Sequence, residues 1–321
     1  MLKSLQGLIK PLVPRPVLEW HRRRLKEGLQ RERFRIDQRI SHLTTATNEK
    51  VRSRLEYEAA PQVRQVLANF GRTEDICFSP GDRRLALAGY VTNRILVLSV
   101  RVVPAGDTYK VLIEDYQMLS SESMRNPHGV SFINEDTVIV ANRGGGVSIF
   151  RLPPANTGER EFDLVPVRRI RRNLLRMRFT PGSVDLYNDN AGTYKALVCN
   201  NYAHVVTSYS LEPGEHFRVG YEGVLLERGL EIPDGISVSG DHRWIAISNH
   251  ADGTVRIYEN VPELNRRSDT TGILRGMGCP HGIRFTADDR YLIVADAATP
   301  WVHIFESGDG DWGAPEIQLL Q

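Results

Sequence analysis

Five copies of one sequence pattern predict an all-β fold for most of this 321-residue chain. The clearest copies are NPHGVSFINEDTVIVANRGGGVSIF, which begins at Asn126, and CPHGIRFTADDRYLIVADAATPWVHIF, which begins at Cys279. The other copies begin at Arg72, Thr180 and Ile232, so the pattern returns about every 50 residues. A repeat of this length without helical periodicity inside it is typical of the blades of a β-propeller.

Each copy predicts the strands of one blade in the same order. In the last copy, GIRF is a short first strand, TADD is a polar turn, RYLIVAD is an apolar second strand, and WVHIF is an alternating third strand. A more polar stretch supplies the fourth strand, for which YKVLIEDYQML, FDLVPVRRI, FRVGYEGVLLE and EIQLL are candidates. The prediction is a propeller over residues 62–321, with five blades favoured and six allowed. The segment Val63–Gly71, VRQVLANFG, fits either an outer strand that closes the ring or a helix.

Residues 1–61 lack the repeat and predict a basic α-helical arm. Residues 1–58 carry 14 Lys and Arg against 7 Asp and Glu, whereas the remainder carries 27 basic and 32 acidic residues. Apolar residues recur at helical spacing in PRPVLEWHRRRLKEGLQRERFRIDQRISHL, and MLKSLQGLIK places its leucines on one face. Such an arm suits an anionic membrane surface or a protein partner for residues 1–45, and packing of its apolar faces on the propeller is the alternative interpretation.

Composition argues against several classes of protein. No apolar run approaches the roughly 20 residues of a membrane span, and the start of the chain lacks the pattern of a secretory signal. The three cysteines, at unrelated spacings, favour a reducing compartment. We therefore expect a cytoplasmic protein, and the arm leaves peripheral attachment to the inner membrane face open. Nucleic acid is not the expected partner, because no aromatic residues alternate with the arginines of VRRIRRNLLRMR, residues 167–178.

One mouth of the central channel is the expected functional site. The innermost strand of each blade lines this channel, so the third residue of each repeat opening should lie at the same mouth. These residues are Glu74, His128, Gly182, Asp234 and His281. Imidazoles and carboxylates are metal ligands, and we predict that Glu74, His128, Asp234 and His281 bind a divalent ion, zinc or calcium. The alternative is a metal-free polar mouth, in which the Pro-X-Gly frame serves only the turn.

The second strands end on the same face and predict a second ring of polar residues. Its predicted substrate-binding members are Asn142, Asn201, Asn249 and Asp296. Arg143 and His250, which follow two of the strand ends, are candidates for proton transfer or anion binding.

These residues predict a metal-assisted enzyme that acts on a small polar or sugar-like metabolite. A non-catalytic scaffold, tethered to a membrane or a partner by the basic arm, is the main alternative. A glycan-binding propeller is a weaker one, because the chain has only four tryptophans and no aromatic repeated at equivalent loop positions.

The motifs NPHGVSFINEDTVIVAN and CPHGIRFTADDRYLIVAD resemble blades of the NHL-type and gluconolactonase-like propeller superfamily, which includes lactonases and the lyase domain of amidating enzymes. The resemblance extends over residues 72–310 and implies a propeller with lactonase or lyase activity. By this resemblance, His128 and His281 match zinc ligands of the lyase, whereas Glu74 and Asp234 match the carboxylates that bind a divalent cation in the gluconolactonase-like proteins. Those families have six or seven blades, and residues 1–60 match none of them.

Overall fold

The computed structural model describes residues 57–313 and 318–319, apart from residues 107, 156, 171–178 and 190–191. Residues 1–56 of the predicted arm, and residues 171–178 of the second basic run, lie outside the described residues. The described part of the chain contains no helix with the length and the hydropathy that a membrane crossing requires.

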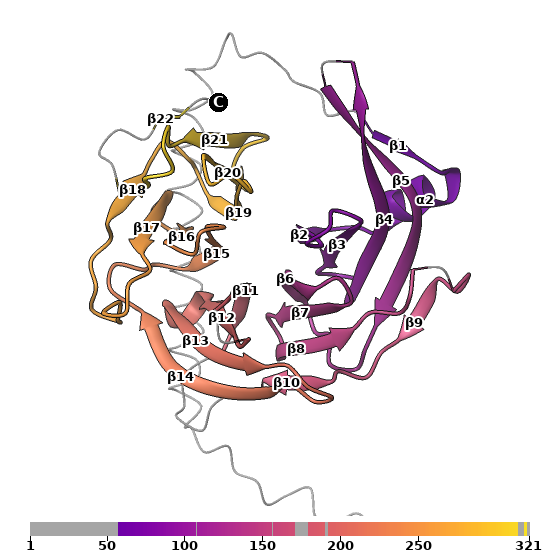
Figure 1. Cartoon of the computed structure of the whole chain (residues 1–321), viewed down its shortest axis with the longest axis horizontal. Helices are drawn as coiled ribbons and strands as arrows, with labels where there is room; N and C mark the ends of the chain where they lie inside the picture. The colour runs from indigo at the N-terminus through magenta and orange to yellow at the C-terminus, as the bar shows by residue number, and fades with distance from the viewer. Residues whose placement is uncertain are drawn as a thin grey trace, which may run out of the picture. The chain divides into compact units, whose positions relative to one another are not determined.

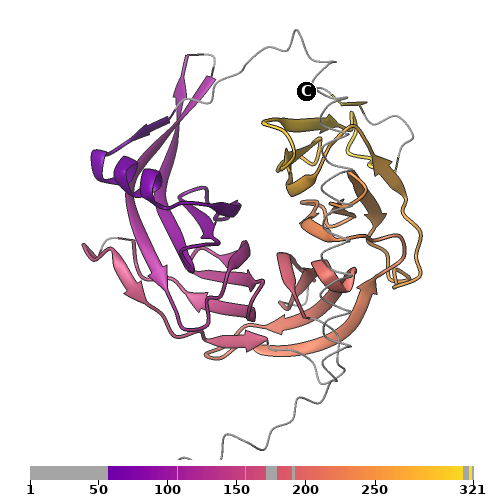
Figure 2. The same cartoon turned by 180° about the vertical axis from the view of Figure 1, so that it is seen from behind.

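Five antiparallel sheets follow one another along the chain, and their first strands lie side by side around a common axis (Figure 1). This arrangement confirms the prediction of a five-bladed propeller. Figure 2 shows the same succession of blades from the opposite side. In every blade the four repeat strands run up-and-down, with the first strand innermost, and in blade 1 two further short strands flank the fourth strand.

The strands of the blades have the following bounds. Blade 1 contains β2 (Thr73–Phe78), β3 (Arg84–Gly89), β4 (Arg94–Ala105) and β5 (Thr108–Ser120). Blade 2 contains β6 (Pro127–Asn134), β7 (Thr137–Asn142), β8 (Gly146–Arg151) and β10 (Arg168–Ile170). Blade 3 contains β11 (Pro181–Asn188), β12 (Tyr194–Asn200), β13 (Val205–Glu212) and β14 (Arg218–Leu226). Blade 4 contains β15 (Pro233–Val238), β16 (Trp244–Asn249), β17 (Thr254–Glu259) and β18 (Gly272–Leu274), and blade 5 contains β19 (Pro280–Phe285), β20 (Tyr291–Asp296), β21 (Val302–Glu306) and β22 (Gln318–Leu319).

One of the predicted outer strands is divided into two short strands in the structure. FDLVPVRRI was expected to form one outer strand, but it forms β9 (Glu161–Asp163), which pairs in parallel with β5 of blade 1, and β10, which completes blade 2. Pro166 lies between the two strands and has no backbone N–H to donate, so a continuous strand is interrupted there.

Two short elements precede the first repeat and attach to blade 1. The segment VRQVLANFG lies in helix α2 (Pro61–Asn69), so the helical alternative is confirmed. Pro61 begins this helix, where its missing N–H costs nothing. Strand β1 (Tyr57–Ala59) pairs in parallel with β5, so the sheet of blade 1 already begins before residue 62.

The turn between the first and second strands of three blades requires a left-handed residue. Asp82, His242 and Asp289 have φ values of 55°, 64° and 57°. Aspartate tolerates this conformation better than most residues, because its short side chain can bond the local backbone. This requirement explains the polar turn that recurs in SPGD, SGDH and TADD.

Apolar clusters between successive blades form the core. Between blades 2 and 3, for example, Ile139 and Ile149 pack with Val184 and Val198. Similar clusters join blades 1 and 2, blades 3 and 4, and blades 4 and 5. The other face of blade 1 is covered by α2, whose Val63 is fully buried. The packing of neighbouring sheets therefore fixes the position of each inner strand, and the inner strands carry the candidate site.

Candidate metal centre

Three potential metal ligands lie together where the inner strands meet. They are Glu74 of β2, His128 of β6 and His281 of β19, and one ligand atom from each lies within 4.8 Å of the others. Glu74 Oε2 lies 3.4 Å from His281 Nε2 and 3.7 Å from His128 Nε2. A tetrahedral zinc ion with bonds of about 2.0–2.1 Å has ligand atoms about 3.3–3.4 Å apart. The three side chains thus have the chemistry and the spacing for a zinc ion.

A backbone irregularity turns these side chains toward the axis. In all five blades, the regular pairing between the first and the second strand is interrupted at the repeat opening. The interruption comes directly after the first-strand residue that pairs with the end of the second strand. A bulge of this kind re-aims the side chain it carries. The residues at the bulges are Glu74, His128, Gly182, Asp234 and His281. The recurring Pro-X-Gly opening is therefore the local sequence that delivers one side chain per blade to the channel mouth.

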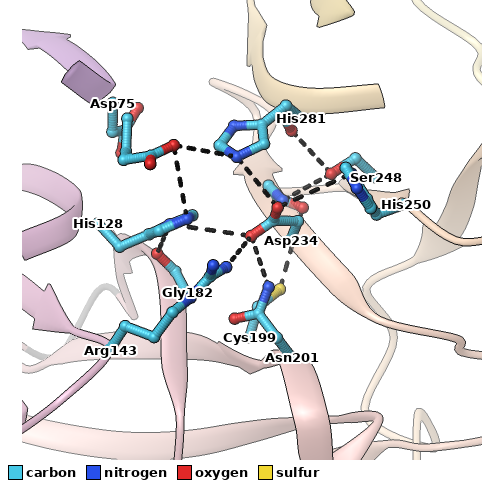
Figure 3. A network of polar contacts seen from close by, with 12 residues as sticks. Asp75, His128, Arg143, Gly182, Cys199, Asn201, Asp234, Ser248, His250 and His281 are labelled. Atoms are coloured by element: carbon cyan, nitrogen blue, oxygen red, sulfur yellow. Dashed lines mark hydrogen bonds and ion pairs between the residues drawn. The ribbon is translucent and has the colours of Figure 1, made fainter. Parts of the chain in front are cut away.

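His128 is held in the form that binds metals. Its Nδ1 lies 2.8 Å from the carbonyl oxygen of Gly182, an acceptor, so Nδ1 carries the proton and Nε2 has the free lone pair. The residue is 2% exposed, and no described residue forms a hydrogen bond with Nε2. Burial lowers the pKa of His128 to about 3, so the imidazole is neutral at physiological pH. Figure 3 shows the ring between Gly182 and the other site residues.

Asp234 of β15 lies beside the three ligands and is held by its own partners. Asn201 Nδ2 donates to Oδ1 at 2.5 Å, and Arg143 donates to the same oxygen at 3.2 Å. Its Oδ2 lies 3.1 Å from His281 Nε2. Burial opposes ionisation, but His281, His128 and Arg143 together lower the pKa of Asp234 below its usual range. Asp234 is therefore a buried carboxylate that holds His281, and its Oδ2 faces the ligand cluster (Figure 3).

In blades 1 to 4, the residue after the second strand contributes to a ring of side chains around this cluster. Arg143 and His250 occupy this position in blades 2 and 4, and His250 Nδ1 lies 3.9 Å from Asp234 Oδ2. In blade 1 the position is held by Tyr90, whose ring meets that of His128 edge-on at 6.0 Å. Asn201 holds it in blade 3, because β12 ends at Asn200 and the chain then enters the short 3-10 helix η1 (Asn201–Ala203).

The register corrects one position in the sequence alignment. The first-strand residues pair with the ends of the second strands as Thr73–Gly89, Pro127–Asn142, Pro181–Asn200, Pro233–Asn249 and Pro280–Asp296. In blade 3 the strand end is thus Asn200, whereas the alignment had placed Asn201 there. Asn201 is the residue after the strand end, equivalent to Arg143 and His250, and its side chain reaches Asp234.

The glycine of blade 3 makes room for this contact. A Cβ atom on Gly182 would lie 1.9 Å from Asn201 Oδ1, so a side chain there is incompatible with the observed position of Asn201. Blade 3 therefore contributes an amide from η1 to the site and no ligand from its inner strand.

Three of the predicted substrate-binding residues turn toward loop backbone. Asn142 Oδ1 accepts from the N–H of Arg125 at 3.2 Å, and Asn249 Oδ1 accepts from that of Glu231 at 2.6 Å. Asp296 accepts from the N–H groups of Gly278 and Cys279 at 2.8 Å. Of the four predicted residues, Asn201 is the one whose side chain bonds to Asp234, which lies next to the ligand cluster. The other three hold the loops that lead to His128, Asp234 and His281.

Two site residues were missed from the sequence. Arg72 Nε lies 2.5 Å from Glu74 Oε1, and its guanidinium stacks over the ring of Tyr90 at 5.0 Å. Both residues are in blade 1, whose opening lacks the Pro and Gly of the other copies. The position after the second strand was a usable signal for Tyr90, because it holds Arg143 and His250 in other blades. No repeated residue type marks Arg72.

No family model and no curated protein matches the sequence. Solved structures match it in fold, among them a chain of a nidogen/laminin complex, with a TM-score of 0.50 and 9% identity over 73% of this chain and 75% of that one. A candidate 6-phosphogluconolactonase from Bacteroides fragilis NCTC 9343 matches with a TM-score of 0.47 and 16% identity, over 76% of this chain and 68% of that one. Hydrazine synthase of Kuenenia stuttgartiensis matches with a TM-score of 0.45 and 11% identity, over 74% and 84% of the two chains. At these identities the likeness is one of fold, which proteins of unrelated activities share.

Proposed function

We propose that the protein is a metal-dependent enzyme of the lactonase or lyase kind, which acts on a small polar or sugar-like metabolite at the channel mouth. The observation that carries this proposal is the buried lone pair of His128 Nε2, which has no hydrogen-bond partner among the described residues. It faces Glu74 Oε2, which also faces His281 Nε2. A buried polar atom without a partner costs about 1–3 kcal/mol, and a bound ion would remove this cost.

The ligand types favour zinc over calcium. Calcium takes six to eight oxygen ligands, whereas two neutral imidazoles and one carboxylate are a common set for catalytic zinc. When bound, such an ion supplies a Lewis acid for a carbonyl oxygen and lowers the pKa of a water molecule. Asp234 lies next to the three ligands, and because its Oδ2 faces the same His281 Nε2 that would bind the ion, it suits the role of a fourth ligand.

The side chains around the ligands suit two further tasks of such a reaction, the binding of a developing anion and the transfer of a proton. Arg143 stays partly exposed while it donates to Asp234, so its guanidinium can also hold an oxygen that gains negative charge in the reaction. His250 is also partly exposed and is placed to move a proton at the mouth. Tyr202 stacks on Arg143, with 5.7 Å between the guanidinium carbon and the ring centre, and limits where that side chain can move.

A scaffold function would not require this arrangement. A propeller that serves only as a support has no need for an unpartnered imidazole lone pair and two carboxylates at the end of its channel. Attachment to an anionic membrane surface or a protein partner through residues 1–45 stays a prediction, and it is compatible with an enzyme in the cytoplasm.

Turnover of a panel of five- and six-membered sugar lactones tests the proposal. We expect zinc- or manganese-loaded protein to open at least one of them, followed by proton release with an indicator dye. Asp234→Asn should lower kcat/KM by roughly 10- to 100-fold, because a neutral amide beside the three ligands balances the charge of the ion less well than a carboxylate and so weakens its binding. The matched control is Asp115→Asn, which removes a carboxylate that pairs with Arg160 on the outer strand of blade 1. Equal turnover by both variants, or no turnover with the metal bound, would contradict the lactonase proposal.

A further inference from the structure

Among the described residues, blade 5 packs against a neighbouring blade on one of its two faces. In β20, buried and exposed side chains alternate, whereas β7 and β16 are buried along their whole length. Leu292 and Val294 face blade 4, but Ile293 is 39% exposed and Val302 of β21 is 51% exposed. In the described part of the chain, no apolar cluster joins blade 5 to blade 1. The ring therefore has a seam, by which we mean the junction of blade 5 with blade 1.

Pairing between strands does not close the seam either. All described strands of blade 5 come from residues 280–319, and those of blade 1 come from residues 57–120 together with β9. No described strand of one blade pairs with the sheet of the other. In Figures 1 and 2 the ribbons of these two blades lie further apart than those of the other neighbouring blades. Among the described residues, the polar contacts that join blade 5 to blade 1 come from side chains of the inner strands, near the axis.

Polar side chains of the inner strands cross the seam at two levels. His281 of β19 faces Glu74 of β2, with Nε2 and Oε2 3.4 Å apart. Further along the same strands, a guanidinium nitrogen of Arg284 lies 3.8 Å from Asp75 Oδ2. The first of these two contacts consists of two of the three candidate metal ligands. The third ligand, His128, belongs to blade 2, which is joined to blade 1 by an apolar cluster.

We propose that the metal ion at this site also closes the ring, so that its occupancy controls whether blade 5 is held against blade 1. This inference rests on the metal site of the proposed function. Bonds from one ion to Glu74 and His281 would link the first blade to the last, at a junction where the described residues form no apolar cluster. The binding free energy of the ion is then free energy that opposes opening of the seam.

We expect the ion to affect the opening of blade 5 and not that of blade 3, because the two blades differ in how they pack against their neighbours. Blade 5 has one packed face and lies at the end of the described chain, so it is the part expected to open first. An opening that separates Glu74 from His281 breaks at least one bond to the ion and weakens its binding, so the opening becomes rarer as the ion concentration rises above the dissociation constant. Blade 3 is packed on both faces and contributes no ligand, so its openings do not depend on the ion.

Hydrogen exchange of the full-length protein, followed by mass spectrometry with and without zinc, tests this inference. At free zinc about 100 times the dissociation constant, we expect exchange in β20, β21 and β2 to slow by up to about 100-fold. Peptides that cover β12 and β13 of blade 3 serve as the internal control and should keep their rates. His281→Ala should show no zinc-dependent protection in blade 5, and bound zinc is measured on the same samples by elemental analysis.

The outcomes separate the two proposals. One zinc per chain with selective protection of the seam strands supports both. One zinc per chain with no added protection, or with equal protection in blade 3, would overturn ring closure by the metal and leave the metal site in place. No bound zinc in the wild-type protein would overturn both.

Discussion

Replacing His128 with alanine is expected to lower the affinity for zinc by about 100- to 1000-fold. A structural zinc site of four ligands contributes about 10–16 kcal/mol, so the loss of one ligand accounts for a few kcal/mol. His128 offers a neutral imidazole whose Nδ1 is already bound to the Gly182 carbonyl, so its Nε2 requires neither deprotonation nor reorientation to bind an ion. Isothermal titration of the metal-free protein with zinc gives the two dissociation constants.

The matched control for this variant is His216→Ala, which removes an imidazole from an exposed loop of blade 3. We expect it to bind zinc as the wild-type protein does. Circular dichroism and a thermal melt establish that both variants are folded. Equal zinc affinities for the two variants would show that His128 is not a ligand.

Replacing Arg284 with methionine is expected to lower the free energy of unfolding by roughly 2–4 kcal/mol. Its guanidinium lies 3.8 Å from Asp75 Oδ2 and 3.5 Å from Asp185 Oδ2, and it donates to the carbonyl oxygen of Val130 at 3.3 Å. One side chain of blade 5 thus contacts blades 1, 2 and 3. The loss of one partner of a fully buried ion pair costs about 3–5 kcal/mol, and the partial exposure of Arg284 reduces this cost.

Urea unfolding measures this effect, and two further variants show its cause. Arg243→Met removes a surface ion pair with Glu259 and should cost less than about 1 kcal/mol. Burial raises the pKa of Asp75, so this carboxylate becomes more costly once Arg284 is gone. Arg284→Met combined with Asp75→Asn should therefore be more stable than Arg284→Met alone. Equal losses for Arg284→Met and Arg243→Met would contradict a role for Arg284 in joining the blades.

The fold was predictable because each blade repeats the same local requirements. The Pro-X-Gly opening marks a bulge at the channel mouth, and the turn TADD contains the left-handed Asp289. The opening residues Glu74, His128 and His281 could be brought together from the sequence, because equivalent positions in a ring of blades face the same axis. Repetition thus gives the positions of the ligand side chains without any knowledge of their contacts.

Features that belong to one blade and are not part of the repeat could not be predicted from the sequence. Asn201 reaches Asp234 from the 3-10 helix η1, whereas turns follow the second strands of the other blades in the described residues. The seam was also hidden in the sequence. In RYLIVAD, Ile293 is as apolar as its neighbours Leu292 and Val294, so the pattern predicts a strand buried on both faces, as β7 is. Only the arrangement of the five sheets shows that one face of β20 has no neighbouring blade among the described residues.

The central claim is that Glu74, His128 and His281 bind one metal ion, and anomalous diffraction from crystals of the zinc-loaded protein tests it most directly. Our account predicts one anomalous peak per chain at the channel mouth, at about 2.0–2.2 Å from His128 Nε2, His281 Nε2 and a carboxylate oxygen of Glu74. Zinc at saturating concentration with no peak between these three side chains would contradict it.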